Sequence, residues 1–241
     1  MKAYIIRMSD NEHSVQCHKN LVQSIIDTNS MLVPIAFEAT QPRDNFEHIR
    51  EVFGSAPVLW TWPLSAKDDG PHLTTGLYLR HYQAVDQARV TAAALSHFRL
   101  WKQCVEHDEP IMVLEHDALF TRRFDGADFL NEKWGAVGLN DPRGATRKGS
   151  LFHQMVQSAG KGLQQVPVID GPNEPPLPMG LAGHSAYLLR PHAAKELLDT
   201  IRTIGMWPND AIMCRQLFRW LRVVNPYYTT IQRGVSTTTQ I

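Results

Sequence analysis

The chain has 241 residues, of which 43% are hydrophobic and 20% charged, so it can form one α/β domain with a sizeable core but has little room for a second. Lysine plus arginine and aspartate plus glutamate number 24 each, and this balance excludes an overall field that would recruit nucleic acid or an anionic membrane. We therefore expect a single domain over residues 1–241, in which any charged partner would need a local patch.

Three cysteines, Cys17, Cys104 and Cys214, are far apart in the sequence and odd in number. They form neither a Cys-x-x-Cys metal pair nor a disulfide framework, so we expect buried free thiols in a reducing compartment. The apolar run at residues 3–6 is too short for a signal peptide, and no stretch approaches the roughly 20 apolar residues of a transmembrane segment. These observations predict a cytoplasmic protein.

The first elements predict the start of a parallel sheet. Residues 3–8 and 32–37 are apolar enough to be strands, and residues 13–29 between them have a helical pattern. Strand, helix and strand at this spacing indicate an α/β fold. Ligands of such open sheets generally bind outside the carboxyl ends of the strands.

Residues 38–80 are expected to form loops, because four prolines and an Asp-Asp-Gly turn interrupt any periodicity. Aromatic residues gather in and just after this segment. They could provide a platform on which a sugar ring stacks, or they could pack in the core, which is the commoner role of large aromatics. They are Trp60, Trp62, Tyr78 and Tyr82.

A helix is expected over residues 85–105, where apolar positions recur at helical spacing and residues 92–94 are alanines. Ser96 and His97 lie inside this helix. From the spacing alone, His97 could lie near a bound ligand or metal, or it could be hydrogen-bonded between the helix and the sheet.

An apolar strand over residues 110–114 runs directly into Glu115 and Asp117, two carboxylates one residue apart. Because side chains alternate along a strand, both are expected on the same side of the sheet edge. Hard cations such as Mn²⁺ and Mg²⁺ take oxygen ligands, commonly one or two carboxylates together with substrate phosphates. The pattern is therefore a candidate metal site, and solvated acids at a strand end are the alternative.

A strand is expected at residues 134–139, followed by a basic loop at 140–149. The loop could grip a diphosphate or an acidic acceptor, or it could simply be solvated. Residues 166–183 are rich in proline and glycine and predict a long loop over the site. The basic residues of the first loop are Arg143, Arg147 and Lys148.

Asp210 follows Trp207-Pro208-Asn209 and precedes a run from Ala211 to Leu221 that is expected to be helical. Two roles are open for this carboxylate. It could cap the N-terminus of that helix, as aspartate often does. It could instead take a proton from a substrate hydroxyl as a general base.

The order Ala94-Leu95-Ser96-His97, Trp101, apolar strand and Glu115-x-Asp117 resembles glycosyltransferase family 25, known from lipooligosaccharide and procollagen galactosyltransferases. Later segments extend the resemblance from about residue 90 to the C-terminus. They are Gly183 to Leu189 with Ala186-Tyr187 inside it, His192 to Lys195, Trp207 to Asp210, and Pro226, Gln232 and Ser236 in that order.

The resemblance implies a GT-A-type fold, with a Rossmann-like, mostly parallel sheet flanked by helices. It implies transfer of a sugar, with inversion, from a nucleotide-diphosphate sugar to a hydroxyl of a glycan or lipooligosaccharide. Residues 1–125 would form the nucleotide-sugar and metal half, and residues 126–241 the acceptor half. Glu115 and Asp117 would hold Mn²⁺ or Mg²⁺, and Asp210 would be the base. The implied donor contacts are Arg7, Ser96, His97 and Tyr187, with His97 orienting the donor.

The chain departs from the family pattern at residues 11–13, at residues 89–92 and at His116, where the usual strand end reads Leu-Glu-Asp-Asp. His116 removes a negative charge beside the metal, although a neutral imidazole can itself bind a metal. Two alternatives therefore stay open. One is a phage-type enzyme that glycosylates a hydroxylated DNA base, which salt-sensitive duplex binding would indicate. The other is a non-catalytic nucleotide-sugar or carbohydrate-binding protein, which would bind the donor without hydrolysis or transfer.

Overall fold

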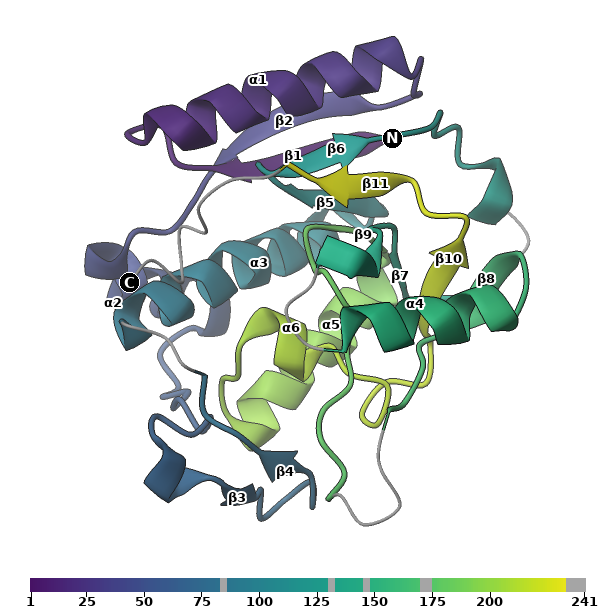
Figure 1. Ribbon diagram of the computed structural model, residues 1–241. Coiled ribbons are helices and arrows are strands. Elements are labelled where there is room, and N and C mark those ends of the chain that lie inside the picture. Colours follow the sequence, from purple (N-terminus) through teal and green to yellow (C-terminus); the bar gives the residue numbers. More distant parts are fainter. Residues whose placement is uncertain (83–85, 130–132, 145–147, 170–174, 233–241) are drawn as a thin grey trace.

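The computed structural model describes residues 1–82, 86–129, 133–144, 148–169 and 175–232. At its centre lies a seven-stranded sheet in the order β2-β1-β5-β9-β7-β10-β8 (Figure 1). Five of these strands point the same way, and β8 and β9 run against them. The predicted class, an α/β fold with a mostly parallel sheet flanked by helices, is confirmed. The strands are β1 (Lys2–Arg7), β2 (Val33–Glu38), β5 (Ile111–Glu115), β7 (Ala136–Gly138), β8 (Gly162–Gln165), β9 (Ala186–Leu189) and β10 (Leu221–Asn225).

The N-terminal strand, helix and strand form as the sequence predicts. Helix α1 (Glu12–Asp27) begins where the Asn11 side chain accepts a hydrogen bond from the backbone N–H of Ser14 at 2.9 Å, an N-cap that satisfies one free donor of the first turn. Strand β1 pairs in parallel with β2 on one side and β5 on the other. Ile6 lies opposite Glu115 in this pairing, so the carboxyl ends of β1 and β5 meet at one edge.

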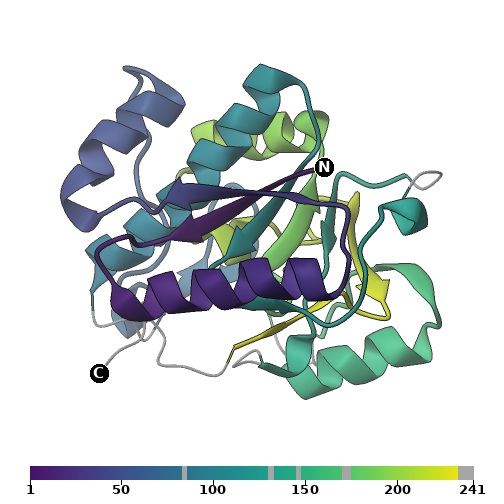
Figure 2. The ribbon, with the colours of Figure 1, turned by 90° about the horizontal axis from the view of Figure 1, so that it is seen from above.

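Helices cover both faces of the sheet. Helix α1 lies on one face with the ribbon formed by β6 (Ala118–Phe120) and β11 (Thr229–Ile231), and helices α3 (Gln87–His107) and α5 (Pro191–Ile204) lie on the other (Figures 1 and 2). The residues of β5 alternate between these two cores, with Met112 and Leu114 on the α1 side and Val113 on the α3 side. Glu115 is next in the alternation and is therefore directed toward α3.

The segment 38–80 differs from the expected loops, because it contains helix α2 (Asn45–Phe53). The proline that suggested a loop, Pro42, stands in the first turn of a short 3₁₀ segment that leads into this helix. Proline is tolerated there because the first N–H groups of a helix have no partner within it. Val52 and Phe53 are buried and fix the helix against the core. A small ribbon of β3 (Gly70–Pro71) and β4 (Tyr78–Leu79) follows.

Two further expectations concern the cysteines and the aromatic residues. Cys17, Cys104 and Cys214 are buried free thiols, as predicted. Trp62 is buried and lies edge-on to Tyr82 and to Trp207, with ring centroids 5.5 Å apart in each pair. A stacking platform is therefore the wrong interpretation for Trp62, which packs in the core. In the part of the chain that the structure describes, no helix combines the length and the apolar character needed to cross a membrane.

Candidate active site

The carboxyl ends of β1 and β5 and the start of β9 meet at one edge of the sheet. The backbone N–H of Glu115 donates to the carbonyl of Ser185 at 2.8 Å, which joins the end of β5 to the residue before β9. His97, from α3, reaches the same place and lies 3.4 Å from a carboxylate oxygen of Glu115. The Glu115 side chain is 37% exposed, so the carboxylate is accessible to a ligand. The His97 side chain is 3% exposed, so the imidazole contacts the carboxylate from the buried side.

A directional hydrogen-bond chain leads to Glu115 through the core. The indole N–H of Trp101 donates to the Tyr187 hydroxyl at 2.7 Å, and that hydroxyl lies 2.9 Å from Nδ1 of His97. An indole can only donate, so the Tyr187 oxygen accepts from it and is free to donate its own proton to Nδ1. The Nε2 atom of the same ring faces Glu115. Burial raises the pKa of Tyr187 well above its usual value, which keeps the phenol protonated for this role.

The two carboxylates of the Glu-x-Asp motif influence each other's ionisation. Burial and the charge of Glu115 raise the pKa of Asp117 to about 7. Burial also acts to raise the pKa of Glu115, but the hydrogen bond and charge of His97, with His184 and His116 nearby, outweigh it and hold that pKa below its usual value. Glu115 is therefore the more readily ionised member of the pair, and Asp117 is the one whose charge lacks compensation.

Asp117 lies in the turn between β5 and β6, and its Oδ1 atom is buried without a hydrogen-bond partner among the described residues. A buried carboxylate oxygen in this condition is rare enough to call for a missing partner. The donor set fits a hard divalent cation, because it offers two neighbouring carboxylates with an open oxygen. Among the described residues no group of three histidine, cysteine, aspartate or glutamate side chains could hold a metal, so further ligands would have to come from the substrate or water.

His116, between these carboxylates, faces the opposite side of the sheet. Its ring lies edge-on to that of His13 in α1, with centroids 6.5 Å apart. Burial lowers the pKa of His116 and keeps the imidazole neutral. The departure from the family pattern at this position thus places a neutral ring against α1.

Asp210 lies within electrostatic range of the same site. Its Oδ1 accepts a hydrogen bond from the Tyr82 hydroxyl at 2.7 Å. Burial raises its pKa, the Tyr82 hydrogen bond opposes this, and the negative charge of Glu115 raises it further. A carboxylate with a raised pKa is better matched to accepting a proton near neutral pH than an exposed one.

The helix expected from Ala211 to Leu221 is wrong, since helix α6 is a single turn (Asn209–Ile212) with Asp210 inside it. The N-cap position belongs to Pro208, and no side chain caps this turn, so the capping role is not the one that the Asp210 carboxylate has. The preceding loop packs closely here. A Cβ on Gly180 would lie 2.4 Å from the carbonyl oxygen of Asp210, which only glycine avoids.

Ser96 and Arg7, the two other predicted donor contacts, lie in different surroundings. The Ser96 hydroxyl accepts a hydrogen bond from the backbone N–H of Thr40 at 2.9 Å, which holds α3 to the segment after β2, and it donates within α3 to the carbonyl of Ala92 at 2.9 Å. Arg7 ends β1 at the same sheet edge as Glu115, and its Nε is buried with no partner within the described ranges.

His184 is a site residue that the sequence did not single out. It is 8% exposed, and in the part of the chain that the structure describes both ring nitrogens are buried without hydrogen-bond partners. Its ring centroid lies 5.5 Å from that of His97 and 4.6 Å from that of Tyr187. Burial, with the charge of His97, lowers the pKa of His184 to about 3, so the imidazole is neutral. Only its place within the resembling segment could have drawn attention to it.

Gln232, which directly follows β11, closes over the turn that holds Asp117. The backbone N–H of Gln232 donates to the carbonyl of Asp117 at 2.7 Å. The Gln232 side-chain amide donates to the carbonyls of Cys17, His116 and Ala118 at 2.9, 3.3 and 3.3 Å. Gln232 therefore fixes this turn to α1, while Ser236, the last residue of the resembling pattern, lies outside the described residues.

The basic residues of the loop after β7 make different contacts. Arg143 makes a two-pronged ion pair with Asp141, with Nη2–Oδ2 at 2.6 Å and Nε–Oδ1 at 3.0 Å. Lys148 donates to the carbonyl of Ile169 at 3.0 Å. Arg147 lies outside the described residues. The guanidinium of Arg143 is thus already matched by a carboxylate.

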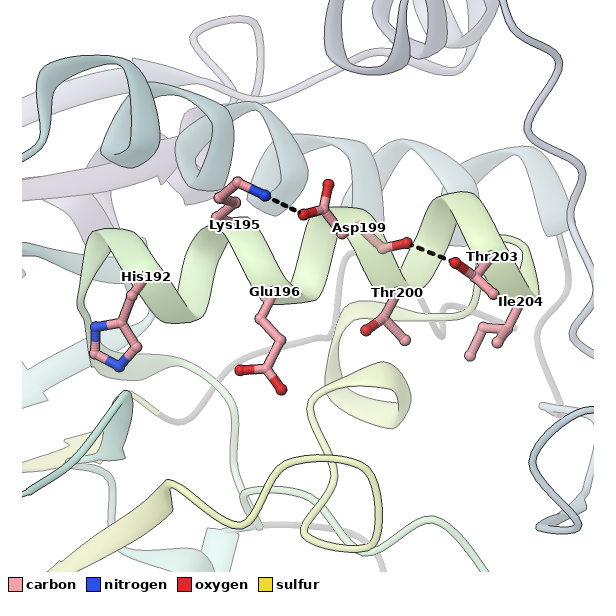
Figure 3. Close-up of a pocket in the computed structure, with 7 residues that line it drawn as sticks. All are labelled: His192, Lys195, Glu196, Asp199, Thr200, Thr203 and Ile204. Carbon is pink, nitrogen blue, oxygen red and sulfur yellow. Dashed lines mark hydrogen bonds and ion pairs between the residues drawn. The ribbon is translucent and has the colours of Figure 1, made fainter.

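A hollow of about 440 Å³ runs along the outer face of α5 (Figure 3). Its lining comes from that one helix, where Lys195 and Thr203 interact with Asp199. None of the site residues predicted from the sequence lines it. This hollow is therefore separate from the sheet edge that carries Glu115 and Asp117.

Comparison with known proteins identifies the segment that carries this edge. Residues 90–140 match the model of glycosyltransferase family 25, described as LPS biosynthesis protein, so the resemblance seen in the sequence is confirmed over the part that contains His97, Glu115 and Asp117. No curated protein sequence matches the chain.

Two solved structures of the glycosyltransferase GlyE from Streptococcus pneumoniae TIGR4 are similar to the chain. One shows 11% identity and a TM-score of 0.36 over 93% of this chain and 45% of that chain. The other, an apo form, shows 12% identity and a TM-score of 0.33 over 95% and 44%. The chain thus spans less than half the length of these proteins, and the similarity is too distant to assign a role to any residue.

Proposed function

We propose that the chain is a glycosyltransferase that moves a sugar from a nucleotide-diphosphate sugar to an acceptor hydroxyl with the help of a divalent cation. The observation that carries this proposal is the unpartnered, buried Oδ1 of Asp117 beside the charged Glu115, in the segment that matches glycosyltransferase family 25. An acidic pair in this condition favours a cation, which would compensate both charges.

Each residue of the site has a distinct role in this proposal. Glu115 and Asp117 would hold Mn²⁺ or Mg²⁺ against the donor diphosphate, and the cation when bound supplies charge neutralisation for the departing group. His97, fixed through Tyr187, orients the donor and keeps Glu115 in place. Arg7 would extend the donor contacts along the same edge, whereas the buried Ser96 supports them by holding α3 to the segment after β2.

Asp210 acts in the proposal as general base. It would take the proton from the acceptor hydroxyl as that oxygen attacks the anomeric carbon, and the nucleotide diphosphate would leave with the electrons of the broken bond. Displacement of this kind inverts the anomeric centre. Tyr82 holds the carboxylate by one oxygen and leaves the other for the acceptor.

The two halves of the chain supply different groups in this proposal. Residues 1–125 supply the donor and cation groups, and residues 126–241 supply Asp210 and the acceptor side. We propose a glycan or lipooligosaccharide as acceptor. A DNA acceptor has less support, because the exposed guanidinium of Arg143 is already paired with Asp141.

A thermal-shift screen tests the proposal. The purified chain is melted with a panel of nucleotide-diphosphate sugars, each with Mn²⁺ and with EDTA. We expect one donor to raise the melting temperature only when Mn²⁺ is present, because selective binding stabilises the folded state. A donor-dependent shift of equal size in EDTA would remove the cation from the proposal. No shift with any donor would contradict the transferase itself.

A transfer assay then separates an enzyme from a binding protein. The stabilising donor is incubated with the chain and acceptor glycans, and release of the nucleotide diphosphate is followed. Binding of the donor without hydrolysis or transfer would identify the non-catalytic alternative. Asp210→Asn should keep the donor-dependent thermal shift while losing transfer, since it removes the base and leaves the donor contacts.

A further inference from the structure

A second hollow, of about 420 Å³, lies between the end of β10, the residues that follow β7, and helix α4 (Gly149–Ser158). Its lining is mainly polar and includes an aromatic hydroxyl. The floor is buried, with Tyr227 9% and Asn225 5% exposed, while Gln157 stands on the exposed rim. The lining residues are Thr121, Asp141, Arg143, His153, Gln157, Asn225, Pro226, Tyr227, Thr229 and Thr230.

The hollow borders the carboxylate site. Asp141 follows β7 and Asn225 ends β10, and both strands run parallel to β5, so their carboxyl ends lie along the same sheet edge. Thr230 lines the hollow and pairs across the β6–β11 ribbon with Leu119, two residues from Asp117. Two residues of a strand span about 7 Å of backbone, so Leu119 lies that far along the chain from Asp117.

The charges in the hollow cancel within the protein. Asp141 and Arg143 form their ion pair at its wall, and the Arg143 pair holds the pKa of Asp141 below its usual value against the effect of burial. Among the described residues, the wall therefore offers neither a free cation for a phosphate nor a free anion for an ammonium group. A ligand with no net charge fits such a lining best.

The remaining lining groups are hydrogen-bonding groups already held in position. The side-chain amide of Gln157 donates to Oδ1 of Asn225 at 2.9 Å, and Asn225 donates in turn to the carbonyl of Gly160. Nδ1 of His153 lies 3.3 Å from the Tyr227 hydroxyl, which leaves Nε2 of His153 available to a ligand. Burial raises the pKa of Tyr227 to about 12, so its hydroxyl stays protonated. Amides, hydroxyls and imidazole suit a ligand whose groups both donate and accept.

We infer that this hollow binds the acceptor as a neutral pyranose, whose hydroxyls each donate and accept a hydrogen bond. The inference rests on the proposed function for its meaning, since a sugar here would lie beside the carboxylates that hold the donor. It names the acceptor subsite and its ligand class, and it assigns His153, Gln157 and Tyr227 to recognition of the acceptor.

The test measures sugar binding without donor and without metal. Methyl β-D-galactopyranoside, methyl β-D-glucopyranoside and methyl β-D-xylopyranoside are each titrated into the ¹⁵N-labelled chain, and the side-chain amide signals of Gln157 and Asn225 are followed by NMR. We expect at least one of these sugars to shift both signals. Gln157→Ala should weaken that sugar about threefold to tenfold, the effect of one lost hydrogen bond.

A matched control lies on the same helix. Gln154 is exposed on α4 and does not line the hollow, so Gln154→Ala should bind the sugar as the unchanged chain does. Equal binding by Gln157→Ala and Gln154→Ala would overturn the inference, as would the absence of a shift with all three sugars. Inorganic phosphate provides a second check, because a phosphate-induced shift of these amides in place of a sugar-induced one would overturn the ligand class.

The outcome is separable from that of the donor screen. Sugar binding in the hollow together with no donor effect at any metal condition would contradict the transferase and leave the subsite standing. A metal-dependent donor shift together with silent Gln157 and Asn225 amides would leave the transferase standing and overturn the subsite.

Discussion

The two ends of this sheet edge differ in whether their polar groups have hydrogen-bond partners within the protein. At the end of β5, Oδ1 of Asp117 and both ring nitrogens of His184 are buried without partners among the described residues. Beyond the ends of β7 and β10, Asp141 is paired with Arg143 and Gln157 with Asn225. A buried polar group that lacks a partner is destabilising, whereas a paired one is held in place. The first end is therefore completed by what it binds, and the second is already complete before anything binds.

The largest effect should come from removing the charge of Asp117. Asp117→Asn keeps the shape of the side chain but withdraws a cation ligand, and we expect transfer to fall at least about 100-fold, equivalent to about 3 kcal/mol. Folding should not suffer, because the change also removes repulsion from Glu115. Transfer rates and thermal melts with Mn²⁺ measure both. Asp125→Asn, at an exposed carboxylate, is the control, and an unchanged rate in Asp117→Asn would remove the metal role.

Breaking the internal chain should cost stability at the same end. Tyr187→Phe deprives the buried Trp101 indole of its acceptor and His97 of its partner at Nδ1. We expect the free energy of unfolding to fall by about 1–3 kcal/mol, the effect of leaving a buried donor unmatched. Urea denaturation measures it, with Tyr78→Phe as control. A loss as small as that of the control would mean that the hydrogen-bond chain is not a source of stability.

The pH dependence of stability should reveal His184. Its pKa is about 3 in the folded state, below the 6.5 of an unperturbed histidine, so the unfolded state binds more protons between these values. The stability that the neutral ring contributes is thus present above pH 6.5 and is lost as pH falls toward 3, by up to about 1.4 kcal/mol per pH unit. His184→Leu should lose this slope. Urea denaturation of the unchanged protein and of His184→Leu at about pH 7 and about pH 5 measures this slope, and equal slopes would contradict the assignment.

The smallest effect should come from the paired end. Arg143 is 63% exposed, so its ion pair with Asp141 is screened by water. Arg143→Gln should lower the free energy of unfolding by less than about 1 kcal/mol. Urea denaturation measures this too. A loss as large as that of Tyr187→Phe would show that the pair is structural, and the contrast between the two ends would not hold.

Elements with a continuous pattern were predictable from the sequence. Strand β5 is an unbroken apolar run and α3 a long periodic one, and both formed close to their expected bounds. Helix α2 was missed because Pro42 suggests a break, whereas the chain uses it at the entrance to the helix. The run after Asp210 has the composition of a helix, yet the helix ends at Ile212.

The site was predictable in its local part only. Glu115 and Asp117 stand one residue apart, so strand geometry alone suggested their proximity. The link from Trp101 to Tyr187 spans 86 residues and exists because β9 inserts beside β5. The lack of partners at His184 depends on packing from several elements, and no local pattern encodes it.

The hydrogen bonds of Gln232 have a consequence for the time at which the site can assemble. This residue joins the Asp117 turn to Cys17, 215 positions earlier, and such distant pairings are slow to form because a long loop must first be closed. During synthesis the strand β5 and its carboxylates leave the ribosome long before β11. The turn that holds Asp117 therefore lacks its hydrogen bonds to Gln232 until that residue has emerged from the ribosome.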